Sequence, residues 1–155
     1  MTSVRRLNHA VLYVRDGRRA ADFYKEAFGF EVVADYGDGQ AVFLRAAETE
    51  NHHDLGLFSI GAQAPPPQPG RVGLYHLAWQ VDTINDLADM RSRLQAMGAL
   101  VGESDHGVTK SLYGKDPDGN EFEVMWMVPR EEWGAMEHEA ITQRLDLASE
   151  VAKHG

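Results

Sequence analysis

Cysteine is absent from this sequence of 155 residues, which excludes disulfide bonds and thiolate metal sites. Any bound metal would therefore need His, Asp or Glu ligands. No apolar run is long enough to span a bilayer, and the first residues lack the hydrophobic stretch of a signal peptide. Basic residues are also scarce: 15 Lys and Arg stand against 24 Asp and Glu, which argues against a nucleic-acid partner. We expect a cytoplasmic protein that binds neither membrane nor nucleic acid.

Two similar halves make up most of the chain. Each half opens with a strand-like segment in which His follows Leu by two residues and Val follows that His by five. An amphipathic helix comes next, capped by Asp16 or Thr83 and ending near Gly29 or Gly98. Three more strands are predicted in each half. The expected strands lie near 7–14, 30–36, 39–45 and 53–60 in the first half and near 74–81, 100–104, 108–114 and 120–128 in the second.

This order of elements predicts an α+β fold in which paired βαβββ modules form a curled mixed sheet around a cup. We place the modules at about 5–60 and 72–128, within a single domain over 1–129. The proline-containing linker between them is too short to separate independent domains. Residues 130–155 are predicted to be a C-terminal helical extension, with the helix running from 131 to 153. This helix would pack on the surface of the domain, or act as a lid or dimer contact.

Strand alternation places three potential metal ligands opposite apolar faces. Side chains at i and i+2 share one face of a strand, so His9, His76 and Glu123 each lie on the face opposite a row of apolar residues. If the sheet curls, these three side chains can converge in the cup. Two His and one carboxylate suit an octahedral metal with open positions, and Zn²⁺ with the same ligands is also possible.

The pattern resembles the vicinal oxygen chelate superfamily, which includes glyoxalase I, extradiol dioxygenases, fosfomycin-resistance enzymes and bleomycin-binding proteins. The residues that carry the resemblance are the two strand openings, 7–9 and 74–76, and the run 116–123, DPDGNEFE. The resemblance implies that His9, His76 and Glu123 bind one divalent metal. It also implies Fe(II) as the cofactor, with Mn(II) or another divalent metal as the alternative, and a homodimer.

Further residues resemble the active site of the extradiol dioxygenases. His53, in the run 51–58, matches a histidine that lies beside dioxygen in those enzymes. His106 matches their acid–base histidine, and Tyr113, ten residues before Glu123, matches the tyrosine that bonds the substrate hydroxyl. Glyoxalase I would need a fourth ligand from the last strand of the first half, where Asp54 is the nearest carboxylate.

The resemblance therefore implies an Fe(II)-dependent extradiol dioxygenase that cleaves a small catechol-like aromatic diol with O2, using His53, His106 and Tyr113 as catalytic residues. One alternative is a glyoxalase-like lyase or isomerase, or a fosfomycin-type transferase, with the same metal site. The other is a bleomycin-type drug-binding protein, which the intact set of ligands argues against.

Overall fold

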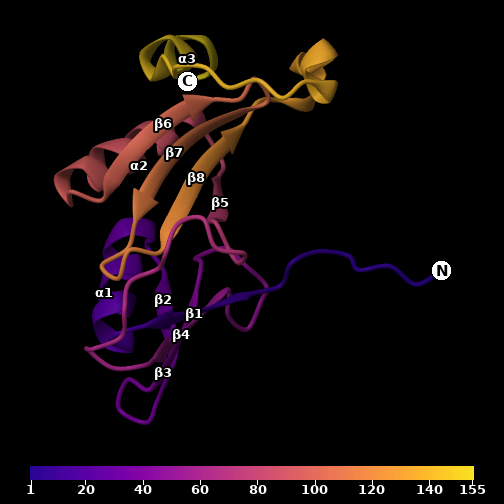
Figure 1. Cartoon of the computed structure of the whole chain (residues 1–155). Helices are drawn as coiled ribbons and strands as arrows, with labels where there is room; N and C mark the ends of the chain where they lie inside the picture. The colour runs from indigo at the N-terminus through magenta and orange to yellow at the C-terminus, as the bar shows by residue number, and fades with distance from the viewer. The chain divides into compact units, whose positions relative to one another are not determined.

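The computed structural model describes residues 1–155, and the chain divides into two compact units (Figure 1). Unit 1 is Met1–Pro67 and unit 2 is Gln68–Gly155. Each unit contains one of the two predicted βαβββ modules, and each module has its own four-stranded mixed sheet. The predicted fold class is thus confirmed. None of the helices has both the length and the apolar character needed to cross a lipid bilayer.

Unit 1 is a four-stranded sheet with one helix packed on it. The strand order is β1-β4-β3-β2, with β1 parallel to β4 and the other neighbours antiparallel. The predicted alternation is present in β1, where Leu12 and Val14 are buried while Val11 and Tyr13 are exposed. The elements are β1 (Ala10–Val14), α1 (Gly17–Phe28), β2 (Glu31–Tyr36), β3 (Ala41–Arg45) and β4 (Leu55–Ser59).

Unit 2 repeats this topology, with the strand order β5-β8-β7-β6 and β5 parallel to β8. On β8, Phe122, Val124 and Trp126 are buried on the face that the sequence assigned to the core. The elements are β5 (Leu77–Val81), α2 (Ile84–Ala96), β6 (Leu100–Asp105), β7 (Thr109–Lys115), β8 (Glu121–Met127), two 3-10 turns (Arg130–Glu132 and Gly134–His138) and α3 (Leu147–His154).

Local capping fixes where the two main helices begin. The Asp16 side chain accepts a hydrogen bond from the backbone N–H of Arg19, and Thr83 forms a reciprocal capping box with Asp86. Each cap contributes about 1 kcal/mol to helix stability. α1 ends at Gly29 in the left-handed conformation, as predicted.

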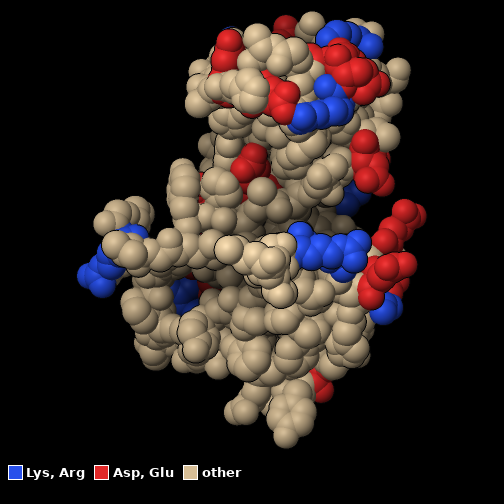
Figure 2. Space-filling model, turned by 90° about the vertical axis from the view of Figure 1, so that its right-hand side faces the viewer, with Lys and Arg blue, Asp and Glu red and all other residues tan.

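The C-terminal segment differs from the prediction. The continuous helix expected over 131–153 is wrong, because α3 begins only at Leu147, after its cap residue Asp146. Two short 3-10 turns come first, the second of them beginning at Gly134 with a φ of 50°, and residues near Gln143 then pair with the end of β6 instead of forming a helix. Of the apolar side chains in this segment, Leu145 is buried. Acidic and basic side chains lie next to one another over this end of unit 2 (Figure 2).

Gly114 provides a test of how tightly the second sheet packs. It lies opposite Phe122 in the β7–β8 ladder, and an added Cβ would overlap the Phe122 ring and lie 2.9 Å from the carbonyl oxygen of Ala99. We expect Gly114→Ala to lower the free energy of unfolding by about 1–3 kcal/mol, because the packed core has no space for the extra methyl group. Urea denaturation measures this change.

Gly102→Ala on the neighbouring strand is the matched control, because its Cβ would meet no atom closer than 4.0 Å. Equal destabilisation by the two substitutions would contradict the tight packing at Gly114.

Candidate metal and active site

His76 and Glu123 lie together in unit 2. The Nε2 atom of His76 is 3.0 Å from Oε2 of Glu123, and Glu123 is 9% exposed. Their proximity follows from the parallel β5–β8 pairing, in which Ala78 is the partner of Glu123 and His76 lies just before β5. The strand predicted over 74–81 thus begins later than expected, at Leu77.

This pair fits a divalent metal. Adjacent ligands of an octahedral ion, at about 2.1 Å from the ion, lie about 3.0 Å apart. The donor set is an imidazole nitrogen and a carboxylate oxygen, both suited to such an ion. The other ring nitrogen of His76, Nδ1, is buried and has no hydrogen-bond partner.

A second polar pair lies beside the first. The Tyr113 hydroxyl is 2.8 Å from Nε2 of His106, and the Tyr113 ring contacts the His76 ring with centroids 5.8 Å apart. In the antiparallel β7–β8 ladder, Tyr113 is directly opposite Glu123. Four of the six predicted site residues therefore lie together in unit 2: His76, His106, Tyr113 and Glu123.

The environment of Tyr113 disfavours its ionised form. Burial raises the pKa of the Tyr113 phenol, and the negative charge of Glu123 raises it further. Tyr113 is therefore a protonated hydroxyl at neutral pH in the metal-free protein. It can donate one hydrogen bond and accept others.

His9 and His53 lie together in unit 1, with ring centroids 4.5 Å apart. His9 lies just before β1, which begins at Ala10 and not at residue 7 as predicted. Its Nδ1 atom is 2.9 Å from the side-chain oxygen of Asn8, an arrangement that leaves Nε2 free to bind a metal. Burial lowers the pKa of His53, and the neighbouring rings of His9 and His52 lower it further, which favours neutral His53.

Asp54, the candidate fourth ligand, has a structural role in its own loop. One carboxylate oxygen accepts the backbone N–H of Ala46 at 2.9 Å, and the other accepts hydrogen bonds from Asn51 at 2.6 Å and Thr49 at 3.2 Å. These bonds support a site with three protein ligands over one with four. In neither unit do three or more His, Asp or Glu side chains form a group able to hold a metal.

Asn51 is a site-supporting residue that sequence reasoning missed. Its buried amide accepts hydrogen bonds from Arg6 and Asn8 and donates to the backbone carbonyl of Asn8 at 2.9 Å. It therefore ties the segment that bears His9 to the loop that bears His53. Its position two residues before His53 was the only available signal.

Comparisons with known proteins identify the family. The Glyoxalase/Bleomycin resistance protein/Dioxygenase superfamily matches residues 6–124, and the chain belongs to this superfamily. It is 33% identical over 125 residues to biphenyl-2,3-diol 1,2-dioxygenase 2 of Rhodococcus globerulus, covering 80% of this chain and 64% of that protein. It is 31% identical over 143 residues to catechol-2,3-dioxygenase of Bacillus subtilis, covering 86% of this chain and 46% of that protein.

Among solved structures, lactoylglutathione lyase from Agrobacterium tumefaciens matches with a TM-score of 0.61 and 27% identity, over 86% of this chain and 99% of that chain. By contrast, the chain spans less than two thirds of the length of each of the two dioxygenases, 64% of one and 46% of the other. Membership of the superfamily and the similarity to these dioxygenases imply a divalent metal site.

Proposed function

We propose that this protein is an extradiol-type dioxygenase that opens the ring of a catechol-like diol with O2. The observation that carries the proposal is the placement of the His106–Tyr113 pair against the His76–Glu123 pair. A metal site alone would serve many reactions, whereas an added histidine–tyrosine pair is suited to moving the protons of a diol. The similarity to two diol dioxygenases supports the same reaction.

The ligand set in this proposal is the one predicted from the sequence: His9, His76 and Glu123. The inclusion of His9 depends on its matching place in the duplicated sequence and on its free Nε2 atom. When bound, Fe(II), or alternatively Mn(II), supplies a positive charge that favours the ionised diol and a redox centre for reaction with O2.

The catalytic residues act on protons and orientation. Tyr113 orients a substrate hydroxyl through its phenol oxygen, and His106 accepts or returns a proton at Nε2. His53, whose lowered pKa favours the neutral ring, would donate a hydrogen bond from its ring N–H to the dioxygen. The ring bond beside the diol breaks, and both oxygen atoms of O2 enter the product, so the reaction needs no external reductant.

Substitution of the catalytic residues tests these roles. We expect Tyr113→Phe and His53→Ala to bind Fe(II) like the unchanged protein but to lower kcat by about 100-fold, since each removes a proton-transfer or hydrogen-bonding group and no metal ligand. Oxygen uptake and the yellow ring-fission product with a panel of catechols, after anaerobic Fe(II) loading, measure kcat. Tyr36→Phe is the control, because Tyr36 is 74% exposed on β2. Normal turnover by Tyr113→Phe would remove Tyr113 from the mechanism.

A lyase or isomerase is the second candidate, supported by the similarity to lactoylglutathione lyase. It would use the same His76–Glu123 pair to polarise a substrate oxygen and would not consume O2. Bound metal without oxygen uptake would favour a lyase or isomerase. Absence of metal binding would favour a drug-binding protein instead. The cytoplasmic location and the homodimer expected from the sequence stay predictions.

A further inference from the structure

We propose that the backbone carbonyl of Ile141, in the C-terminal segment, fixes the tautomer of His106 and thereby directs its basic nitrogen toward Tyr113. Ile141 is thus a positioning residue that acts through His106. The structural part of this inference is independent of the reaction, whereas its catalytic meaning rests on the proposed dioxygenase function.

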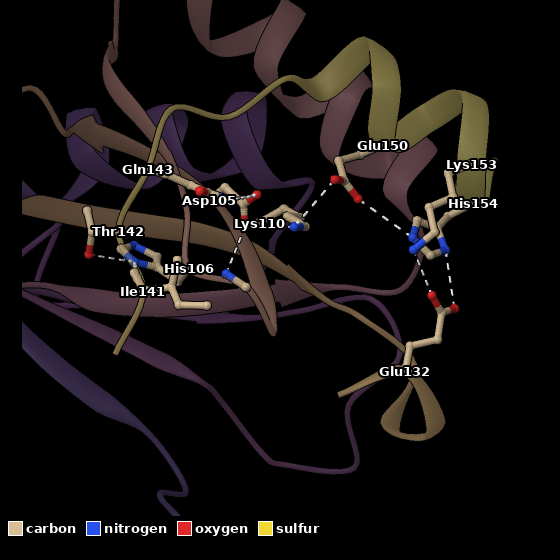
Figure 3. A network of polar contacts seen from close by, with 11 residues as sticks. Asp105, His106, Lys110, Glu132, Ile141, Thr142, Gln143, Glu150, Lys153 and His154 are labelled. Carbon is tan, nitrogen blue, oxygen red and sulfur yellow. Dashed lines mark hydrogen bonds and ion pairs between the residues drawn. The ribbon is translucent and has the colours of Figure 1, made fainter. Parts of the chain in front are cut away.

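Both ring nitrogens of His106 have partners, and the two partners differ in chemistry. Nδ1 lies 2.9 Å from the carbonyl oxygen of Ile141 (Figure 3). Nε2 lies 2.8 Å from the Tyr113 hydroxyl. A carbonyl oxygen can only accept, so Nδ1 must carry the proton. In the neutral ring Nε2 is then unprotonated and must accept from the Tyr113 O–H.

Thr142 does not overturn this assignment. Its hydroxyl oxygen is 3.3 Å from Nδ1, farther than the Ile141 carbonyl, and a hydroxyl can accept as well as donate. The shorter contact, to a group without a proton, therefore decides the tautomer.

The Ile141 carbonyl is held in place by pairing of the segment with the end of β6. The backbone N–H of Asp105 donates to the Gln143 carbonyl and the N–H of Gln143 donates to the Asp105 carbonyl, both at 2.9 Å. The Gln143 side chain donates to the Asp105 carboxylate at 3.0 Å, and Lys110 donates to the same carboxylate at 2.7 Å (Figure 3). The two backbone hydrogen bonds thus hold a carbonyl that is 35 residues from His106 in the chain, and the side-chain bonds hold the Asp105 carboxylate beside them.

Gly107 lets the segment approach this closely. Its φ is +77°, and a Cβ there would lie 3.0 Å from Cδ1 of Ile141 and 3.2 Å from Sδ of Met136. The turn after His106 therefore requires glycine for its conformation and for the space that the C-terminal segment fills.

The consequence for the reaction is a defined direction of proton movement. Tyr113 donates its proton to His106, which leaves the lone pairs of the phenol oxygen free to accept from a substrate hydroxyl. A proton can then pass from substrate to Tyr113 while the Tyr113 proton passes to Nε2 of His106. With the other tautomer, Nε2 would donate to Tyr113 and could not accept this proton.

Nitrogen NMR of the full chain without metal tests the inference. Long-range ¹H–¹⁵N spectra of the imidazoles, with His106→Gln to assign the signal, distinguish the tautomers at a pH where the ring is neutral. We expect Nδ1 of His106 to be protonated and Nε2 to be unprotonated. A neutral His106 protonated at Nε2 would overturn the inference, whatever the protein's activity.

Two substitutions at Gln143 separate the backbone contact from the side chain. Gln143→Pro removes the N–H that pairs with Asp105, so we expect a mixture of tautomers and, in the Fe(II) enzyme, a kcat lower by about 10- to 100-fold with little change in KM. Gln143→Ala keeps the backbone pairing and should keep the tautomer. An unchanged single tautomer and kcat in a folded Gln143→Pro protein would contradict the positioning role.

The expected tautomer without any oxygen uptake would instead reject the proposed dioxygenase function and leave the role of Ile141 intact. The two proposals therefore fail separately.

Discussion

Replacement of Glu123 by Gln is expected to weaken Fe(II) binding by more than about 100-fold and to abolish oxygen uptake. The carboxylate is the only anionic member of the proposed ligand set, and it lies 3.0 Å from the other ligand atom of unit 2, Nε2 of His76. Gln keeps the size of the side chain but loses the charge that attracts the cation. Metal content after anaerobic loading and desalting measures the effect without reference to turnover.

Glu121→Gln is the matched control for this prediction. Glu121 lies on the same strand, two residues before Glu123, and pairs with Lys115 across the ladder. We expect this variant to retain its metal and its activity. Equal metal content in the two variants would show that Glu123 is not a ligand.

Replacement of Lys110 by Met is expected to lower the free energy of unfolding by about 3–5 kcal/mol. The Lys110 side chain is 7% exposed, and its Nζ atom lies 2.7 Å from Asp105 and 3.4 Å from Glu150. Removal of the ammonium leaves the Asp105 carboxylate buried with only its bonds from Gln143 and Gly107. Urea or thermal denaturation at neutral pH measures the loss.

The loss should depend on pH in a defined direction. Burial alone would raise the pKa of Asp105, but the bonds from Lys110, Gln143 and the Gly107 N–H outweigh it and hold the pKa below its usual value. A carboxyl with a depressed folded-state pKa stabilises the fold above its unfolded-state pKa, and this stabilisation disappears as pH falls through the folded-state value. The difference in the free energy of unfolding between the unchanged protein and Lys110→Met should therefore become smaller as the pH falls.

Lys25→Met is the control for the Lys110 prediction. Lys25 forms an exposed ion pair with Asp22 on α1, at 3.3 Å, and such pairs contribute about 0–1 kcal/mol. A similar loss for the two lysines would contradict the account of the buried network.

Most of the fold was predictable because local signals determine it. Asp16 and Thr83 cap helices in the structure as their positions in the sequence indicate, and the alternation of apolar residues assigns the buried face of β8 correctly. The helix over 131–153 was predicted wrongly because composition there favours a helix, whereas pairing of Gln143 with Asp105 holds part of the segment extended. Such a long-range contact leaves no periodic signal in the sequence.

The candidate site was predictable to a similar extent. The spacing of ten residues between Tyr113 and Glu123 corresponds to directly opposed positions in the β7–β8 hairpin, so the motif itself encodes their proximity. The contact of His106 with Ile141 was not predictable, because a backbone carbonyl carries no residue-specific signal. The hydrogen bonds that occupy Asp54 likewise depend on the conformation of the 46–54 loop.

The most direct test of the central claim is the fate of labelled oxygen. The Fe(II)-loaded protein is mixed under ¹⁸O2 with the catechol that gives the fastest oxygen uptake. The mass of the ring-opened product is then measured by mass spectrometry. The account predicts one O2 consumed for each diol, with both labelled atoms in the product. Product that contains no labelled oxygen, or tight metal binding without any oxygen consumption across the panel, would contradict it.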